Sequence, residues 1–201
     1  MSLLTVLPLA VVMVAGPQIL SAIFLATSGE WRRNSAAYVF GASLSISAVV
    51  TLAYLLSDGA SRQGTSNDIL NAIVLVLLLA AMVNTYRTRD ESEPPAWMGK
   101  LQQANPRFSF RLGFLLLGLF PSDVFTAVAV GSYLSANDLP LTDAAGFVAL
   151  TLLFLALPAL VLLAFGDRAE VFLPKARDWM NENAWLVNEV VILLFVAMIL
   201  G

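Results

Sequence analysis

The residues that could carry chemistry in this chain are few, and the most informative is Asp123, a carboxylate inside a long apolar run. A carboxylate near the centre of a bilayer costs on the order of 2.5–3.5 kcal/mol. The central parts of the apolar runs contain no Lys or Arg to pair with it. We therefore expect Asp123 to be protonated, to face a hydrated cavity or to meet a cation, as a substrate or coupling group would. The alternative is a neutral acid that hydrogen-bonds a backbone carbonyl and only holds helices together.

Two Pro–polar segments occupy equivalent places in the two halves of the chain. Residues 16–28 read GPQILSAIFLATS, and residues 119–132 read LFPSDVFTAVAVGS. Because Pro lacks an N–H and displaces the carbonyl four residues earlier, Pro17 should free the C=O of Met13, and Pro121 that of Leu117. Paired interruptions in corresponding membrane helices are the best sequence pointer to a transporter's central site, although a single Pro can also be an ordinary kink.

The predicted transport pathway therefore combines the residues around both breaks. Glu189, near the start of the last apolar run, is a weaker candidate because a Glu there can also extend to the membrane surface. The pathway residues are Gly16, Pro17, Gln18, Pro121, Ser122, Asp123, Thr126 and Glu189. Ser43 and Ser47, spaced i,i+4 near Gly41, are interpreted instead as a small-residue stripe for helix packing.

Several kinds of chemistry are excluded by residue types that the chain lacks. It has no His and no Cys, which removes the commonest general base, thiolate metal sites and thiol redox chemistry. A nucleophile–base pair is also missing around Ser122 and Asp123, so we expect no catalytic residues, no bound metal and no cofactor. A net charge of −3 with 11 basic residues gives no basic patch for nucleic acid.

The composition then identifies the elements that must position these residues. The 201 residues are 59% hydrophobic and 12% charged, with a mean hydropathy of +0.81, whereas a soluble domain carries about 25% charged residues. Six apolar runs are long enough to cross a bilayer: residues 3–27, 35–56, 69–86, 108–135, 144–165 and 184–201. The runs are continuous rather than alternating, which predicts an all-α polytopic membrane protein.

An odd number of spans in each half implies that the second half is inverted relative to the first. The predicted organisation is a three-helix repeat at 1–86, a cytoplasmic linker at 87–107 and a second three-helix repeat at 108–201. Ten of the 11 Lys and Arg residues fall in or beside alternate connections, so the positive-inside rule places both termini outside the cell. Within one of these connections, residues 174–181 begin with Pro, which suits a short surface helix.

The segment AGPQILSAIFLATS (residues 15–28), with the later FPSD (residues 120–123), resembles the GAP family of the lysine-exporter (LysE) superfamily. These are peptidoglycolipid- or sulfolipid-addressing proteins. The resemblance extends over nearly the whole chain in size, six spans and a long central loop. It implies export of small solutes or ions, or movement of glycolipids to the cell surface, and it implies a homodimer. It also implies that Pro17, Gln18, Pro121 and Asp123 line the central pathway.

Two functions from different classes follow. The first is a secondary transporter in the plasma membrane that exports a small or lipid-linked solute by alternating access around the two breaks, with Asp123 available for proton coupling. The chain has no GxxxxGK[ST] motif, so a nucleotide would not drive it directly. The second is a lipid-handling membrane factor, or an accessory subunit of a larger exporter, which presents a lipid in a groove open to the bilayer. Membrane lipids are expected partners in both.

Overall fold

The computed structural model describes residues 3–60, 101 and 103–183. This part of the chain is predominantly helical and contains no strand. Its elements, in chain order, are α1 (Leu3–Val14), α2 (Pro17–Ala26), α3 (Trp31–Ala60), α5 (Pro106–Leu119), α6 (Pro121–Ala136), the short 3₁₀ turn η3 (Leu141–Ala144), α7 (Ala145–Phe165) and α8 (Asp167–Glu182). The predicted spans at 69–86 and 184–201, most of the linker at 87–107, and Glu189 lie outside the described residues.

Four of the six predicted spans fall within the described residues. Two helical stretches, Trp31–Ser57 and Leu141–Phe165, are each long and apolar enough to cross a membrane. The other two predicted spans are each a bent pair, Val6–Val14 with Pro17–Ala26 at 67° and Pro106–Leu119 with Pro121–Ala136 at 66°. These helices support the prediction of a membrane protein, and both bends occur where the sequence predicts a break.

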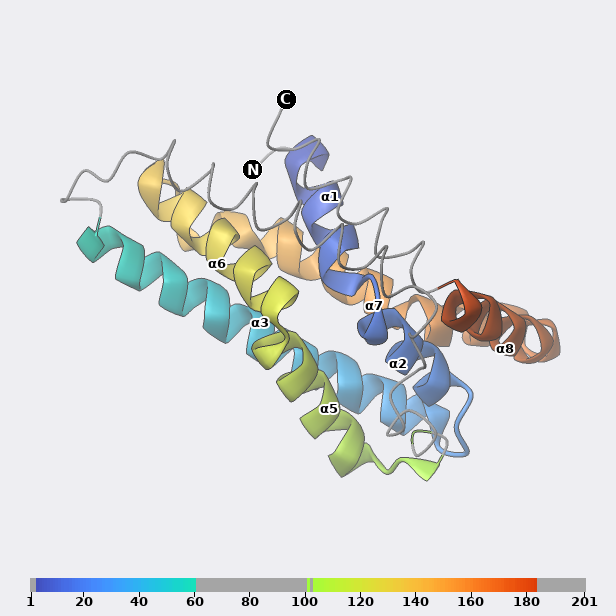
Figure 1. The fold of residues 1–201 in the computed structure, drawn as a ribbon. Helices are drawn as coiled ribbons and strands as arrows, with labels where there is room; N and C mark the ends of the chain where they lie inside the picture. Colours follow the sequence, from blue (N-terminus) through green and yellow to red (C-terminus); the bar gives the residue numbers. More distant parts are fainter. Residues whose placement is uncertain (1–2, 61–100, 102, 184–201) are drawn as a thin grey trace.

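The long helix α3 lies beside both α5 and α6, which follow one another along its length (Figure 1). Glycines allow this close approach. A Cβ added at Gly41 would overlap the carbonyl oxygen of Phe110, and one at Gly113 would overlap the carbonyl oxygen of Tyr38. On α6, a Cβ at Gly131 would overlap the carbonyl oxygen of Val50. Small residues at helix crossings are typical of membrane proteins, because they let the two backbones touch.

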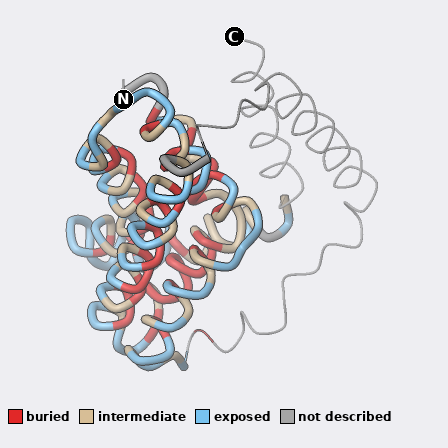
Figure 2. Tube along the Cα trace, turned by 90° about the vertical axis from the view of Figure 1, so that its left-hand side faces the viewer, coloured by how far each residue is buried: buried red, intermediate tan, exposed pale blue. Residues whose placement is uncertain are grey.

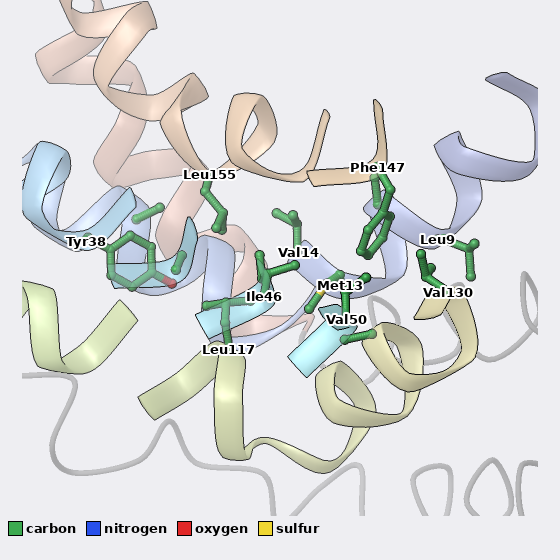
Figure 3. Packing of buried hydrophobic residues seen from close by; sticks show 14 of the residues in the cluster. Leu9, Met13, Val14, Tyr38, Ile46, Val50, Leu117, Val130, Phe147 and Leu155 are labelled. Carbon is green, nitrogen blue, oxygen red and sulfur yellow. The ribbon is translucent and has the colours of Figure 1, made fainter. Parts of the chain in front are cut away.

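A second group of helices packs against α3 and α6 from another side. Helix α7 contacts α1, α2 and α3, and α1 also contacts α6. The buried residues form a band through the middle of the helices (Figure 2). Side chains from α1, α3, α5, α6 and α7 meet in this core (Figure 3), whose fully buried members include Met13, Tyr38, Ile46, Leu117 and Phe147.

Helix α8 is longer than the surface helix predicted at 174–181. It begins at Asp167, directly after Gly166 with φ 50°, and runs through Pro174 to Glu182. Pro174 therefore does not start the helix as predicted. Asp167 and Glu170 lie in the first turn, where the helix dipole favours acidic side chains, and these residues mark the true start.

Candidate functional site at the two helix breaks

The first break is complete, because one helix ends and another begins. Helix α1 ends at Val14, and α2 begins at Pro17 after Gly16, whose backbone has φ 96° and ψ −139°. This backbone region is essentially restricted to glycine. Pro17 occupies the first position of α2, where its missing N–H costs nothing. The sequence predicted a broken helix at this position, with an ordinary proline kink as the alternative, and the structure shows two helices joined by a glycine.

At the second break one helix also ends and another begins at a proline, but the residue before that proline is not a glycine. Helix α5 ends at Leu119, Phe120 is extended with φ −69° and ψ 127°, and α6 begins at Pro121. The residue before a proline is disfavoured in helical conformation, which explains why α5 stops here. Asp123 therefore lies in the first turn of α6, where the helix dipole stabilises a negative charge.

The two breaks are joined by a side-chain hydrogen bond. The amide Nε2 of Gln18 donates to Oδ2 of Asp123 at 2.6 Å, and both residues are fully buried. The hydroxyl of Ser122 donates to the other carboxylate oxygen at 3.2 Å. The pair connects positions 105 residues apart in the sequence. The structure thus brings together Gln18, Ser122 and Asp123, three of the residues predicted to form the pathway.

Tyr38 is a fourth member of this centre, and the sequence analysis did not identify it. Its hydroxyl donates to the backbone carbonyl of Gln18 at 2.9 Å, and its side chain is fully buried. Gln18 is therefore held by α3 through its backbone and by α6 through its side chain. Because α3 is apolar on nearly every face, hydrophobic periodicity gives no signal that separates Tyr38 from its neighbours.

The other predicted pathway residues within the described part of the chain are not hydrogen-bonded to the carboxylate. Thr126 donates to the carbonyl of Ser122 at 2.8 Å, and Ser21, which was not a predicted pathway residue, donates in the same way to the carbonyl of Pro17 at 2.6 Å. Both hydroxyls thus bond the first turn of their own helix. Gly16 and Pro17 are half-buried, whereas Pro121 is exposed. These residues shape the breaks, and Glu189 lies outside the described residues.

The centre has spare hydrogen-bonding capacity but no cation. Oε1 of Gln18 is buried and has no hydrogen-bond partner within the described part of the chain. Within the same residues no Lys or Arg pairs with Asp123, and no three acidic side chains gather to hold a metal. An ionised carboxylate can only accept hydrogen bonds, whereas a protonated one can also donate. The arrangement can therefore exchange a proton or accept a polar substrate group.

A separate groove runs along the seam between α3 and α7. A cavity of about 730 Å³ lies between residues 31–43 of α3 and residues 152–163 of α7. A second cavity of about 380 Å³ continues along the same two helices, and Leu152 lines both. Ser43 lines the first and Ser47 the second. Gly41 packs against α5 as predicted for the small-residue stripe, but the two serines line this groove.

Comparison with known proteins identifies the family. A family model described as "Sap, sulfolipid-1-addressing protein" matches residues 6–201. The chain belongs to this sulfolipid-addressing family. Membership confirms the sulfolipid-addressing part of the predicted resemblance, while placement in the LysE superfamily stays a prediction. Neither the curated proteins nor the solved structures gave a match. Together with its apolar helices, membership in the sulfolipid-addressing family indicates a membrane protein involved in lipid handling.

Proposed function

We propose that this protein is a secondary transporter that exports a lipid-linked solute across the plasma membrane by alternating access, as the LysE superfamily would. The observation that carries the proposal is the 2.6 Å hydrogen bond between Gln18 and Asp123, which closes the space between two broken helices. Broken helices that meet at a polar centre are the usual architecture of a secondary transporter's substrate site. In the proposed assembly the chain is a homodimer of six-helix inverted repeats, with both termini outside and no enzymatic activity.

The pair is closed to both water and lipid in this conformation, because Gln18 and Asp123 are fully buried. Access to the centre requires α2 and α6 to separate, which breaks the bond. A substrate hydroxyl or amide could then replace Gln18 as the donor to the carboxylate. The first turns of α2 and α6 would add unpaired backbone N–H groups, which suit an anionic substrate group.

Proton coupling would use the two hydrogen-bonding states of the pair. The ionised carboxylate accepts from Gln18 Nε2 and Ser122 Oγ. A protonated Asp123 would instead donate its O–H to Gln18 Oε1, the atom that lacks a partner here, after a 180° rotation of the amide. Among the described residues, Tyr38 is the other titratable group at the centre, and its hydroxyl donates to the backbone carbonyl of Gln18, which a rotation of the side-chain amide would not move.

Transport by purified protein in proteoliposomes would test the proposal. The probe is a short-chain fluorescent glycolipid carrying one sulfate, and its transfer between leaflets is followed by chemical quenching of the outer leaflet under an imposed pH gradient. The variant Asp123→Asn keeps the shape of the side chain but cannot be ionised. The matched control is Asp138→Asn, at an exposed position with φ 52° that Asn tolerates.

We expect wild type and Asp138→Asn to move the probe faster under the gradient than without it. Asp123→Asn should lose the dependence on the gradient. Transfer by Asp123→Asn with the wild-type rate and the wild-type gradient dependence would overturn the role of Asp123 in coupling. Equal transfer by wild-type and protein-free vesicles would overturn the transport function.

The alternative, a lipid-handling factor that presents a lipid without a transport cycle, is favoured by one observation. The α3–α7 groove is open at its side rather than enclosed within the helices. In the same assay such a factor would retain the probe after purification but would show no gradient-dependent transfer. An accessory subunit of a larger exporter would give this result as well, and crosslinking in native membranes would then identify its partner.

A further inference from the structure

We infer that the end of the α3–α7 groove near Trp31 is a binding site for a phospholipid with an anionic headgroup. The phosphate would contact Arg32 and Ser35, and one acyl chain would lie along the apolar part of the groove. This site is distinct from the Gln18–Asp123 centre and does not depend on the transport function proposed above.

The groove has the length and the lining of a lipid site in one leaflet. Its larger cavity extends from Trp31 to Ser43 on α3, a rise of about 18 Å in a helix. One leaflet contributes about 15 Å to the hydrocarbon core. Apart from Arg32, Ser35 and Ser43 the walls are chiefly apolar and include Val39, Phe40, Ala156, Leu160 and Leu163. The volume of about 730 Å³ lies within the range of small-molecule sites.

The one charged side chain of the cavity lining, Arg32, and the buried Ser35 lie at the same end of the cavity. Arg32 lines it and lies 5.1 Å from the ring centroid of Trp31, a cation–π contact that holds the guanidinium at the mouth. Trp31 begins the membrane-crossing stretch of α3, so both side chains lie at the depth of lipid headgroups. Among the described residues Arg32 has no carboxylate partner, whereas the neighbouring Arg33 pairs with Glu30 at 3.7 Å.

Ser35 gives an independent indication of a ligand. Its side chain lines the same cavity one turn below Arg32, and the residue is only 7% exposed. Its hydroxyl has no hydrogen-bond partner in the described part of the chain. Buried hydroxyls are nearly always hydrogen-bonded. A phosphate oxygen at the mouth would accept from Ser35 and from Arg32 together, which would give both groups the partner that they lack among the described residues.

Native mass spectrometry of the full-length protein would test the site. Delipidated protein is titrated with phosphatidylglycerol and, separately, with phosphatidylcholine of identical chains. Wild type should prefer phosphatidylglycerol, and Arg32→Gln should reduce that preference about fivefold or more, as expected for one cation at the membrane surface. Ser35→Ala should also reduce the preference for phosphatidylglycerol over phosphatidylcholine. Arg33→Gln makes the same change in charge one residue away, outside the cavity, and should keep the preference.

A second set of variants tests the acyl part of the groove. Ala159→Leu fills the groove between α3 and α7 and should weaken binding of both lipids. Ala164→Leu, at an exposed position of α7 outside the cavity, should bind as wild type does. Equal effects of Arg32→Gln and Arg33→Gln, or normal binding by Ala159→Leu, would overturn the inference. So would a photocrosslinker at Ala159 that captures protein, from this chain or from a second copy, in place of lipid.

Discussion

The hydrogen bond between Gln18 and Asp123 should contribute measurably to stability, and a double-mutant cycle isolates its contribution. The variants are Gln18→Met, Asp123→Ala and the double variant. Each single change removes one side of the bond, so the departure from additivity measures the interaction itself.

The magnitude follows from the burial and geometry of the pair. Hydrogen bonds between membrane helices contribute about 0.6 kcal/mol on average and at most about 1.7, while bonds to charged groups contribute about 1.5–3 kcal/mol. The Gln18–Asp123 bond is short at 2.6 Å and fully buried. We therefore expect a coupling free energy of about 1.5 kcal/mol, which is roughly a tenfold change in the unfolding equilibrium constant.

Reversible unfolding of the purified protein in mixed micelles with increasing dodecyl sulfate would measure this energy. A control cycle replaces Ser57 and Ser132 by Ala, because their hydroxyls form a neutral, partly buried contact of 2.8 Å between α3 and α6. The control coupling should not exceed about 0.6 kcal/mol. If the Gln18–Asp123 coupling is no larger than that of the control, the bond does not hold the two breaks together.

Three further predictions concern the surroundings of the centre, and unfolding in mixed micelles measures each free energy change. Gly113→Ala would press a Cβ against the Tyr38 carbonyl and should destabilise the protein by about 1–3 kcal/mol. The control Gly146→Ala, which has open space around the added Cβ, should be neutral. Equal effects of the two variants would refute the close contact between α3 and α5. Gly16→Ala should destabilise by about 1–3 kcal/mol, because φ 96° strains any residue with a Cβ, and a neutral result would contradict the observed break. Tyr38→Phe removes the hydroxyl that donates from α3 to the Gln18 carbonyl and should destabilise by about 1 kcal/mol, with no loss meaning that this bond does not help to hold α2 against α3.

The breaks were predictable from the sequence because proline acts locally. The missing N–H and the ring of proline favour a break at Pro17 and at Pro121, but they do not force one, because α8 runs through Pro174. Whether a proline kinks one helix or starts another depends on the backbone conformation of the residue before it. Gly16 and Phe120 are both non-helical, so a new helix begins at Pro17 and at Pro121.

The contacts of the centre were only partly predictable. Asp123 stands out because an acid in an apolar run is costly, and its buried position required some polar partner. Its pairing with Gln18 depends on where α2 and α6 cross, which sequence alone does not fix. Tyr38 was not identified from the sequence for a related reason. Ser43 and Ser47 were also assigned to helix packing, whereas they line the groove. In a membrane helix the faces toward lipid and toward protein are both apolar, so periodicity does not show which face meets which neighbour.

Helix α3 connects the two candidate sites, and its packing indicates how they would affect each other. Gly41 and Gly113 bring the backbones of α3 and α5 into contact, which favours α3 and α5 moving together. Helix α7 packs on α1 and α2 and is separated from α3 along part of its length by the groove. Helix α6 packs on α3 through Gly131, so the Gln18–Asp123 bond from α2 to α6 joins the α1–α2–α7 group to the α3–α5–α6 group. The groove between α3 and α7 lies at the boundary between these two groups. Separation of the pair in the proposed cycle would therefore change the width of the groove, so a lipid bound there would influence which state of that cycle the protein adopts.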